Sequence, residues 1–127
     1  MDNIYLGTIT IDCNDEVALC EFYHNLLGWK KTFLYGHTAV RSETGVTFLF
    51  IEEEDYVPPV WPEKAGFQQK QIHFDFGVPN VAAAVEHALV LGASTAAKQF
   101  GNSDEYVVML DPAGHPFCLC AAENEPD

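Results

Sequence analysis

The chain has 127 residues, 48% of them hydrophobic, and a formal net charge of −13 from 19 acidic and 6 basic residues. This length fits a single domain with its own core. The negative charge disfavours phosphate backbones and anionic lipid as partners, so we expect no nucleic acid and no membrane. The first residues, MDNIYLG, lack the basic and apolar regions of a signal peptide, which favours a cytoplasmic protein. The four cysteines show no disulfide-framework spacing and are expected to be thiols.

The N-terminal part of the chain predicts a strand followed by a helix. Residues 7–12 alternate between apolar and polar side chains, as a half-buried strand does. Apolar residues then recur at helical spacing over residues 16–27. Asn14 or Asp15 can cap this helix, and Gly28 closes it with a left-handed residue.

Three further strands are predicted after the helix. Residues 29–34 and 38–42 form a hairpin, and the nearly all-apolar run 46–51 predicts a strand that is buried on both faces. Residues 52–69 contain an acidic cluster and several prolines, which a central strand does not accept. This stretch is therefore predicted to be an irregular crossover.

The second half of the chain repeats this order. Residues 71–78 alternate with Ile72, Phe74 and Phe76 on one face, and with His73 and Asp75 on the other. The following elements are a helix, two strands and a last strand, with turn residues between them. Their predicted ranges are 81–91, ending at Gly92, then 95–100, 106–110 and 117–120.

An internal repeat relates the two halves. Thr8 and His73 each precede the helix-cap region by seven residues, so they superpose, and counting from the glycine before each last strand superposes Leu49 on Cys118. Each half is thus βαβββ and leaves one open sheet face. Two curved open faces are covered most simply by turning them towards one another.

The predicted fold class is therefore α+β, with two βαβββ modules whose curved mixed sheets form a barrel-like cavity. We expect one domain over residues 1–127. Module one covers about 4–57, the crossover loop about 58–69 and module two about 70–122.

Three segments carry a family resemblance: DEVALCEFYHNLLGW at residues 15–29, PPVWP followed by HFDF, and VMLDPAGHPFCL at residues 108–119. With these segments the chain resembles the glyoxalase/bleomycin resistance/dioxygenase superfamily, also called the vicinal oxygen chelate fold. It is most similar to the glyoxalase-like subgroup of uncharacterised function. The resemblance spans the whole chain and implies a homodimer.

The resemblance also implies four metal-ligand positions, which are usually His, Glu or Gln. Here these positions hold Thr8, Leu49, His73 and Cys118. Only His73 is a conventional ligand, so we expect no metal cofactor. A divalent metal bound through His73, Cys118 and the neighbouring Asp75 stays open as an unusual ligand set.

His73 is the candidate general base, with Asp75 as a second catalytic residue that influences its protonation. Two residues along a strand are separated by about 6.6–6.8 Å, which does not guarantee a direct contact between these side chains. The alternative is that His73 is a satisfied polar residue. Cys118 is expected to be a small buried hydrophobe rather than a nucleophile, because no basic neighbour is visible in the sequence.

Other residues are candidates for ligand binding only. Trp61, between prolines, is predicted to be either an aromatic lid or a hydrophobic plug beneath a long loop. His115 lies in a turn and is expected to face solvent. The full predicted ligand-binding set is Thr8, Thr10, Leu49, Trp61, His73, Asp75 and Cys118.

Three functions remain open. The first is a small-molecule-binding protein that lacks a complete metal site and holds an organic ligand, cationic or aromatic, between the two modules or between two chains. The second is an enzyme, a lyase, isomerase or dioxygenase-like protein that uses His73 with or without a divalent metal. The third is an interaction module whose acidic surface engages a basic protein.

Overall fold

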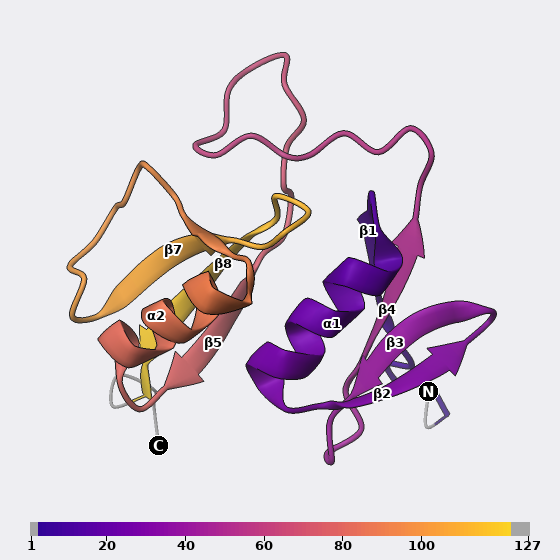
Figure 1. The fold of residues 1–127 in the computed structure, drawn as a ribbon. Helices are drawn as coiled ribbons and strands as arrows, with labels where there is room; N and C mark the ends of the chain where they lie inside the picture. The colour runs from indigo at the N-terminus through magenta and orange to yellow at the C-terminus, as the bar shows by residue number, and fades with distance from the viewer. Residues whose placement is uncertain (1–2, 123–127) are drawn as a thin grey trace. The chain divides into compact units, whose positions relative to one another are not determined.

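The computed structural model describes residues 3–122, which form two compact units, one ending at Tyr56 and one beginning at Val57 (Figure 1). Each unit has the order βαβββ, so the predicted α+β class with two such modules is confirmed. No helix in the described part of the chain is long and apolar enough to cross a membrane. The first unit contains β1 (Ile9–Cys13), α1 (Glu16–Leu27), β2 (Lys30–Leu34), β3 (His37–Arg41) and β4 (Thr47–Glu52). The second contains β5 (Phe74–Val78), α2 (Val81–Leu91), β6 (Ser94–Thr95), β7 (Tyr106–Leu110) and β8 (Pro116–Ala121).

Both units contain a four-stranded mixed sheet with the same topology. The strand order is β1-β4-β3-β2 in the first sheet and β5-β8-β7-β6 in the second. The first strand of each unit pairs in parallel with the last, and the other pairs are antiparallel. Over residues 3–122 neither sheet closes on itself, and the barrel-like cavity stays a prediction.

Both helices begin and end at the predicted residues. The Asp15 carboxylate accepts a hydrogen bond from the Ala18 amide at 3.0 Å, and the Asn80 side chain accepts one in the same way at the start of α2. Such a cap contributes about 1 kcal/mol. Gly28 and Gly92 end the helices with φ values of 72° and 116°, where a residue with Cβ would be strained.

The core of the first unit is aromatic. Tyr23 on α1 stacks on Phe50 of β4 with 5.8 Å between ring centroids, and both side chains are fully buried. The Phe48 ring meets Tyr23 edge-on. Thr47 to Phe50 are all buried, as predicted for a strand that is covered on both faces, whereas Val46 at the start of the predicted run is 38% exposed.

Glu16 ties the start of α1 to the sheet of its unit. Its carboxylate accepts hydrogen bonds from the backbone amides of Thr38 and Glu52, at 3.0 and 3.2 Å, and lies 2.9 Å from His37 Nδ1. Burial alone would raise the pKa of Glu16, but these hydrogen bonds and the charge of His37 outweigh it and hold the pKa below its usual value. The carboxylate is therefore a structural acceptor.

In the second unit, α2 packs against β6, β7 and β8. Phe117, Met109 and Leu119 are buried to 1% exposure or less, and the Phe76 ring lies 5.9 Å from that of Phe117. Because side chains alternate along a strand, the residues between these point to the opposite face of the sheet.

The predicted strand 71–78 is shorter than expected. The strand begins at Phe74, since the chain makes a tight turn centred on Gln71, which has a φ of 61°. The Ile72 amide donates to the Lys70 carbonyl at 2.7 Å across this turn. Ile72, predicted to pack on the apolar face, is instead 70% exposed.

The predicted strand 95–100 was also wrong in extent, because β6 ends at Thr95. Beyond it the Gln99 side chain takes over the edge of β7. Its amide group donates to the carbonyls of Ala96 and Val108, and its oxygen accepts from the Val108 amide, all at 2.8–2.9 Å. A side chain thus satisfies the backbone groups that a longer strand would have paired.

Candidate functional site

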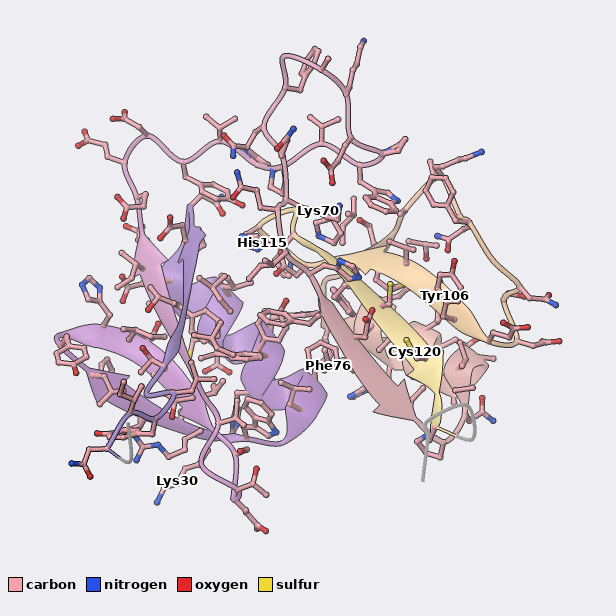
Figure 2. The ribbon with its side chains drawn as sticks, turned by 180° about the vertical axis from the view of Figure 1, so that it is seen from behind. Lys30, Lys70, Phe76, Tyr106, His115 and Cys120 are labelled. Carbon is pink, nitrogen blue, oxygen red and sulfur yellow. The ribbon has the colours of Figure 1, made fainter. Side chains whose placement is uncertain are left out.

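The open sheet face of the second unit, which we define as the face of β5 and β8 opposite Phe76 and Phe117, carries the predicted site residues. Asp75 on β5 pairs in register with Cys118 on β8, and Cys118 pairs with Val108 on β7. Figure 2 labels Phe76 and Cys120, which lie on these neighbouring strands. The register therefore places a carboxylate beside a thiol on one face.

His73 joins this pair directly. Its Nε2 lies 3.2 Å from Asp75 Oδ1, and the two side chains are 38% and 61% exposed. The separation of two residues along an ideal strand did not guarantee this contact between the His73 and Asp75 side chains. It forms because His73 precedes β5, after the turn at Gln71, and is not held in the pleat. One ligand atom each of His73, Asp75 and Cys118 lies within 4.8 Å of the others.

The Cys118 thiol is held in its protonated form. Burial raises its pKa, and the hydrogen bond to the Asp75 carboxylate and the negative charge of that group raise it further, to about 12. A reactive cysteine needs the opposite surroundings, with a cation or a helix N-terminus nearby. The environment agrees with the prediction of a small buried hydrophobe.

Trp61 lies against the same cluster. Its half-buried ring packs on the buried group of Ala96, Val108 and Cys118. The indole Nε1 donates to the Lys98 carbonyl at 3.1 Å. These contacts favour the hydrophobic plug over the lid.

Lys70, which the sequence did not single out, holds the crossover loop at this point. Its ammonium group lies 4.9 Å above the Trp61 ring and forms an ion pair with Glu63. The Lys70 side chain is only 14% exposed. Nothing in the sequence distinguishes this lysine, because its partners are brought to it by the fold of the loop.

Asp111, which is buried, and His115 form a second polar contact that sequence reasoning missed. Asp111 is 4% exposed, and its carboxylate accepts hydrogen bonds from the amides of Ala113 and His115 at 2.9 Å. His115 Nδ1 also lies 2.9 Å from Asp111 Oδ2. His115 is therefore held by the turn and, with 23% of its side chain exposed, faces solvent only in part. The turn sequence DPAGH was the available signal.

The predicted residues of the first unit occupy the matching positions of their own sheet. Thr10 on β1 pairs in register with Leu49 on β4, as Asp75 pairs with Cys118. Thr8 is half-buried just before β1, Thr10 is exposed and Leu49 is 5% exposed. The register supports the superposition of Leu49 on Cys118.

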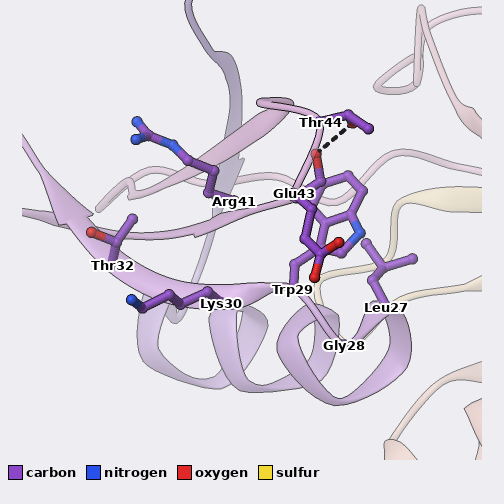
Figure 3. Close-up of a pocket in the computed structure, with 9 residues that line it drawn as sticks. Leu27, Gly28, Trp29, Lys30, Thr32, Arg41, Glu43 and Thr44 are labelled. Atoms are coloured by element: carbon purple, nitrogen blue, oxygen red, sulfur yellow. Dashed lines mark hydrogen bonds between the residues drawn. The ribbon is translucent and has the colours of Figure 1, made fainter.

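The first unit also contains an open groove of about 840 Å³, shown in Figure 3. None of the predicted site residues lines it. Its walls come from the end of α1, from β2 and from the turn between β3 and β4: Leu27, Gly28, Trp29, Lys30, Thr32, Arg41, Ser42, Glu43 and Thr44.

The family resemblance implies a divalent metal, and the donor chemistry here does not fit its usual centre. Leu49 has no donor atom, and the neutral hydroxyl of Thr8 is a weak ligand for a divalent ion. The remaining group of nitrogen, carboxylate oxygen and sulfur, from His73, Asp75 and Cys118, belongs to one unit alone. Such a mixed set is of the kind that zinc accepts, rather than an oxygen-chelating centre.

Comparisons with known proteins agree with this fold. Residues 8–120 match the sequence model of the glyoxalase-like domain. No curated protein sequence matches the chain.

Several solved structures are similar over nearly the whole chain. A glyoxalase-related enzyme from Fulvimarina pelagi is 16% identical with a TM-score of 0.68, covering 96% of this chain and 91% of that one. A glyoxalase/bleomycin resistance protein/dioxygenase family enzyme from Burkholderia phytofirmans PsJN is 18% identical with a TM-score of 0.66, covering 91% and 97%. A glyoxalase/bleomycin resistance protein from Albidiferax ferrireducens T118 is 17% identical with a TM-score of 0.65, covering 95% and 98%. At these identities the likeness shows the fold alone.

Proposed function

Because the chain belongs to the glyoxalase-like domain family, we propose that it is a small-molecule-binding protein whose ligand lies on the open sheet face of the second unit. The observation that carries this proposal is the contact of His73, Asp75 and Cys118 on that face, beside the half-buried Trp61. The ligand is organic and binds without the metal centre of the family. Polar groups that converge next to an aromatic side chain are typical of such sites.

The proposed ligand is cationic or aromatic. The Asp75 carboxylate is 61% exposed and offers an anionic partner to an ammonium group, and the net charge of −13 raises the local concentration of cations. The rings of Trp61 and Phe100, with centroids 5.5 Å apart, offer apolar surface nearby. The positive charge of Lys70 above Trp61 favours a ligand whose ring, rather than its cation, meets this indole.

A second candidate function is an enzyme, a lyase or isomerase in which His73 moves a proton. The distance of 3.2 Å between His73 Nε2 and Asp75 favours it, since a carboxylate that orients an imidazole supports general base catalysis. Neutral imidazole would accept the proton at the ring nitrogen that Asp75 does not contact. The protonated Cys118 thiol takes no part as a nucleophile.

A ligand screen tests the binding proposal. Aromatic amines, neutral aromatics and cell extracts are screened by ligand-observed NMR and native mass spectrometry against the intact protein. Hits are then titrated into His73→Ala, Asp75→Asn and the control His87→Ala, which removes an exposed imidazole from α2.

We expect at least one hit whose affinity falls about tenfold or more in Asp75→Asn, equivalent to about 1.4 kcal/mol, and is unchanged in the control. No hit at all, or hits that bind these variants equally, would overturn the proposal. Turnover of a hit that is lost in folded His73→Ala would favour the enzyme instead.

A further inference from the structure

The groove of the first unit is lined by residues of one unit only and has the volume of a small-molecule site, about 840 Å³. The Trp29 indole and the Leu27 side chain, both half-buried, supply apolar surface. Thr32, Ser42 and Thr44 add hydroxyl groups, and the hydroxyls of Ser42 and Thr44 are 3.0 Å apart (Figure 3). This composition suits an organic ligand with one polar end.

Two cations line this groove. Lys30 on β2 pairs in register with Arg41 on β3, and residues directly opposite one another share a face of the sheet. Like charges in this arrangement destabilise a sheet. An anion bound between Lys30 and Arg41 would offset the repulsion between their charges.

These two cations also lack the partners that the other basic residues have. Lys31 and Lys70 form ion pairs, and Lys64 and Lys98 lie over the rings of phenylalanines. Within residues 3–122, Lys30 and Arg41 have neither an ion pair nor an aromatic ring contact. In a chain with 19 acidic and 6 basic residues, this is an unusual concentration of unneutralised positive charge.

Arg41 is positioned for a ligand. Its Nε donates to Thr47 Oγ1 at 3.0 Å, and Thr47 is only 2% exposed, so one edge of the guanidinium is fixed to the sheet. The terminal nitrogens are then directed away from that contact. Glu43 also lines the groove, but Figure 3 shows it on the side of Trp29, away from Arg41 and Lys30.

We propose that this groove binds a small organic carboxylate, held between the side chains of Lys30 and Arg41. A guanidinium matches a carboxylate through paired hydrogen bonds, and the adjacent ammonium adds a second charge. The site goes beyond the proposed function, because it lies in the other unit and selects ligands of opposite charge.

The test is a titration of the ¹⁵N-labelled full chain with benzoate, followed by NMR. Phenyl phosphate and benzyl alcohol serve as a second oxyanion and as a neutral isostere. The variants are Lys30→Gln and Arg41→Gln, with Lys64→Gln as the control for loss of an exposed cation in the second unit.

Saturable shifts of Lys30 and of residues 41–44 with benzoate are expected, with weaker binding at higher salt. Affinity should fall about tenfold in either groove variant and stay unchanged in Lys64→Gln, in His73→Ala and in Asp75→Asn. The proposal is overturned if benzoate gives no saturable shift at about 20 mM, if benzyl alcohol binds equally well, or if the groove variants bind like the control. Tighter binding of phenyl phosphate would overturn the choice of carboxylate. Because the groove variants and the His73 and Asp75 variants change different units, failure of this proposal can be told apart from failure of the proposed function.

Discussion

The Cys118 thiol gives the sharpest prediction about the candidate site. Its pKa of about 12 implies a thiolate fraction near 10⁻⁴ at pH 8, against about a quarter for an ordinary thiol of pKa about 8.5. The thiolate population is thus about 2,000-fold smaller. A more basic thiolate is intrinsically about 40-fold more nucleophilic, for a Brønsted coefficient near 0.45. The net expectation is a rate about 50-fold below that of the unfolded chain, before steric exclusion at 7% exposure lowers it further.

The rate is measured by brief treatment with methyl methanethiosulfonate at pH 8, followed by peptide mapping in a mass spectrometer. The same peptide in urea gives the unfolded reference. Asp75→Asn should accelerate the native reaction, because it removes the carboxylate that raises the thiol pKa. Asp12→Asn removes an exposed carboxylate from β1 and should have no effect.

Two results would refute this reasoning. Native Cys118 that reacts within about threefold of the unfolded rate would mean that the thiol is neither buried nor neutral at pH 8. An unchanged rate in folded Asp75→Asn would mean that burial alone protects the thiol and that Asp75 does not act on it.

Three stability predictions follow from other contacts. Glu16→Gln should lower the free energy of unfolding by about 1–2 kcal/mol at pH 7, measured in urea, because a charged acceptor of backbone hydrogen bonds is lost. Since the pKa of Glu16 is lower in the folded than in the unfolded protein, the extra stability of the native protein over Glu16→Gln is present above pH 4.5 and is lost as pH falls through the folded pKa. A difference in unfolding free energy that does not change with pH would contradict this. Gln99→Ala should cost about 1–3 kcal/mol in the same assay by leaving the Val108 amide without its acceptor, whereas a neutral result would show that water replaces the side chain. Gly114→Ala should cost about 1–2 kcal/mol, because Gly114 has a φ of 92° and a new Cβ would lie 3.1 Å from Pro58, whereas Gly7→Ala, which meets nothing within 4 Å, should be nearly neutral.

The sequence predicted the repeated architecture well because its signals are local. Helix caps at Asp15 and Asn80 and closing glycines depend on a few adjacent residues. The burial of β4 on both faces follows from an uninterrupted apolar run. Two such halves in the same order were sufficient to predict both βαβββ units.

The errors lie where contacts between distant residues decide the backbone. No local signal shows that the Gln99 side chain would cap β7, so a propensity for strand beyond Thr95 was extended too far. The turn at Gln71 depends on a positive φ at a residue other than glycine, which sequence patterns rarely indicate. That turn also brought His73 into contact with Asp75, which ideal strand spacing did not predict.

The candidate site was predicted in part. Superposing the halves identified His73 and Cys118, and alternation added Asp75. The roles of Lys70 and Asp111 depend on how loops fold back, and the groove with Lys30 and Arg41 depends on cross-strand register. Such register is set by the whole sheet and is not visible in either strand alone.

The most direct test of the central claim, an organic-ligand protein without the family's metal centre, is elemental analysis of untagged protein purified without chelator, with His73→Ala alongside. The account predicts that divalent metal is far below one equivalent in both proteins and is not taken up on titration. A near-stoichiometric metal that is lost in His73→Ala would contradict it. That result would make His73, Asp75 and Cys118 a metal site and direct the work to lyase assays.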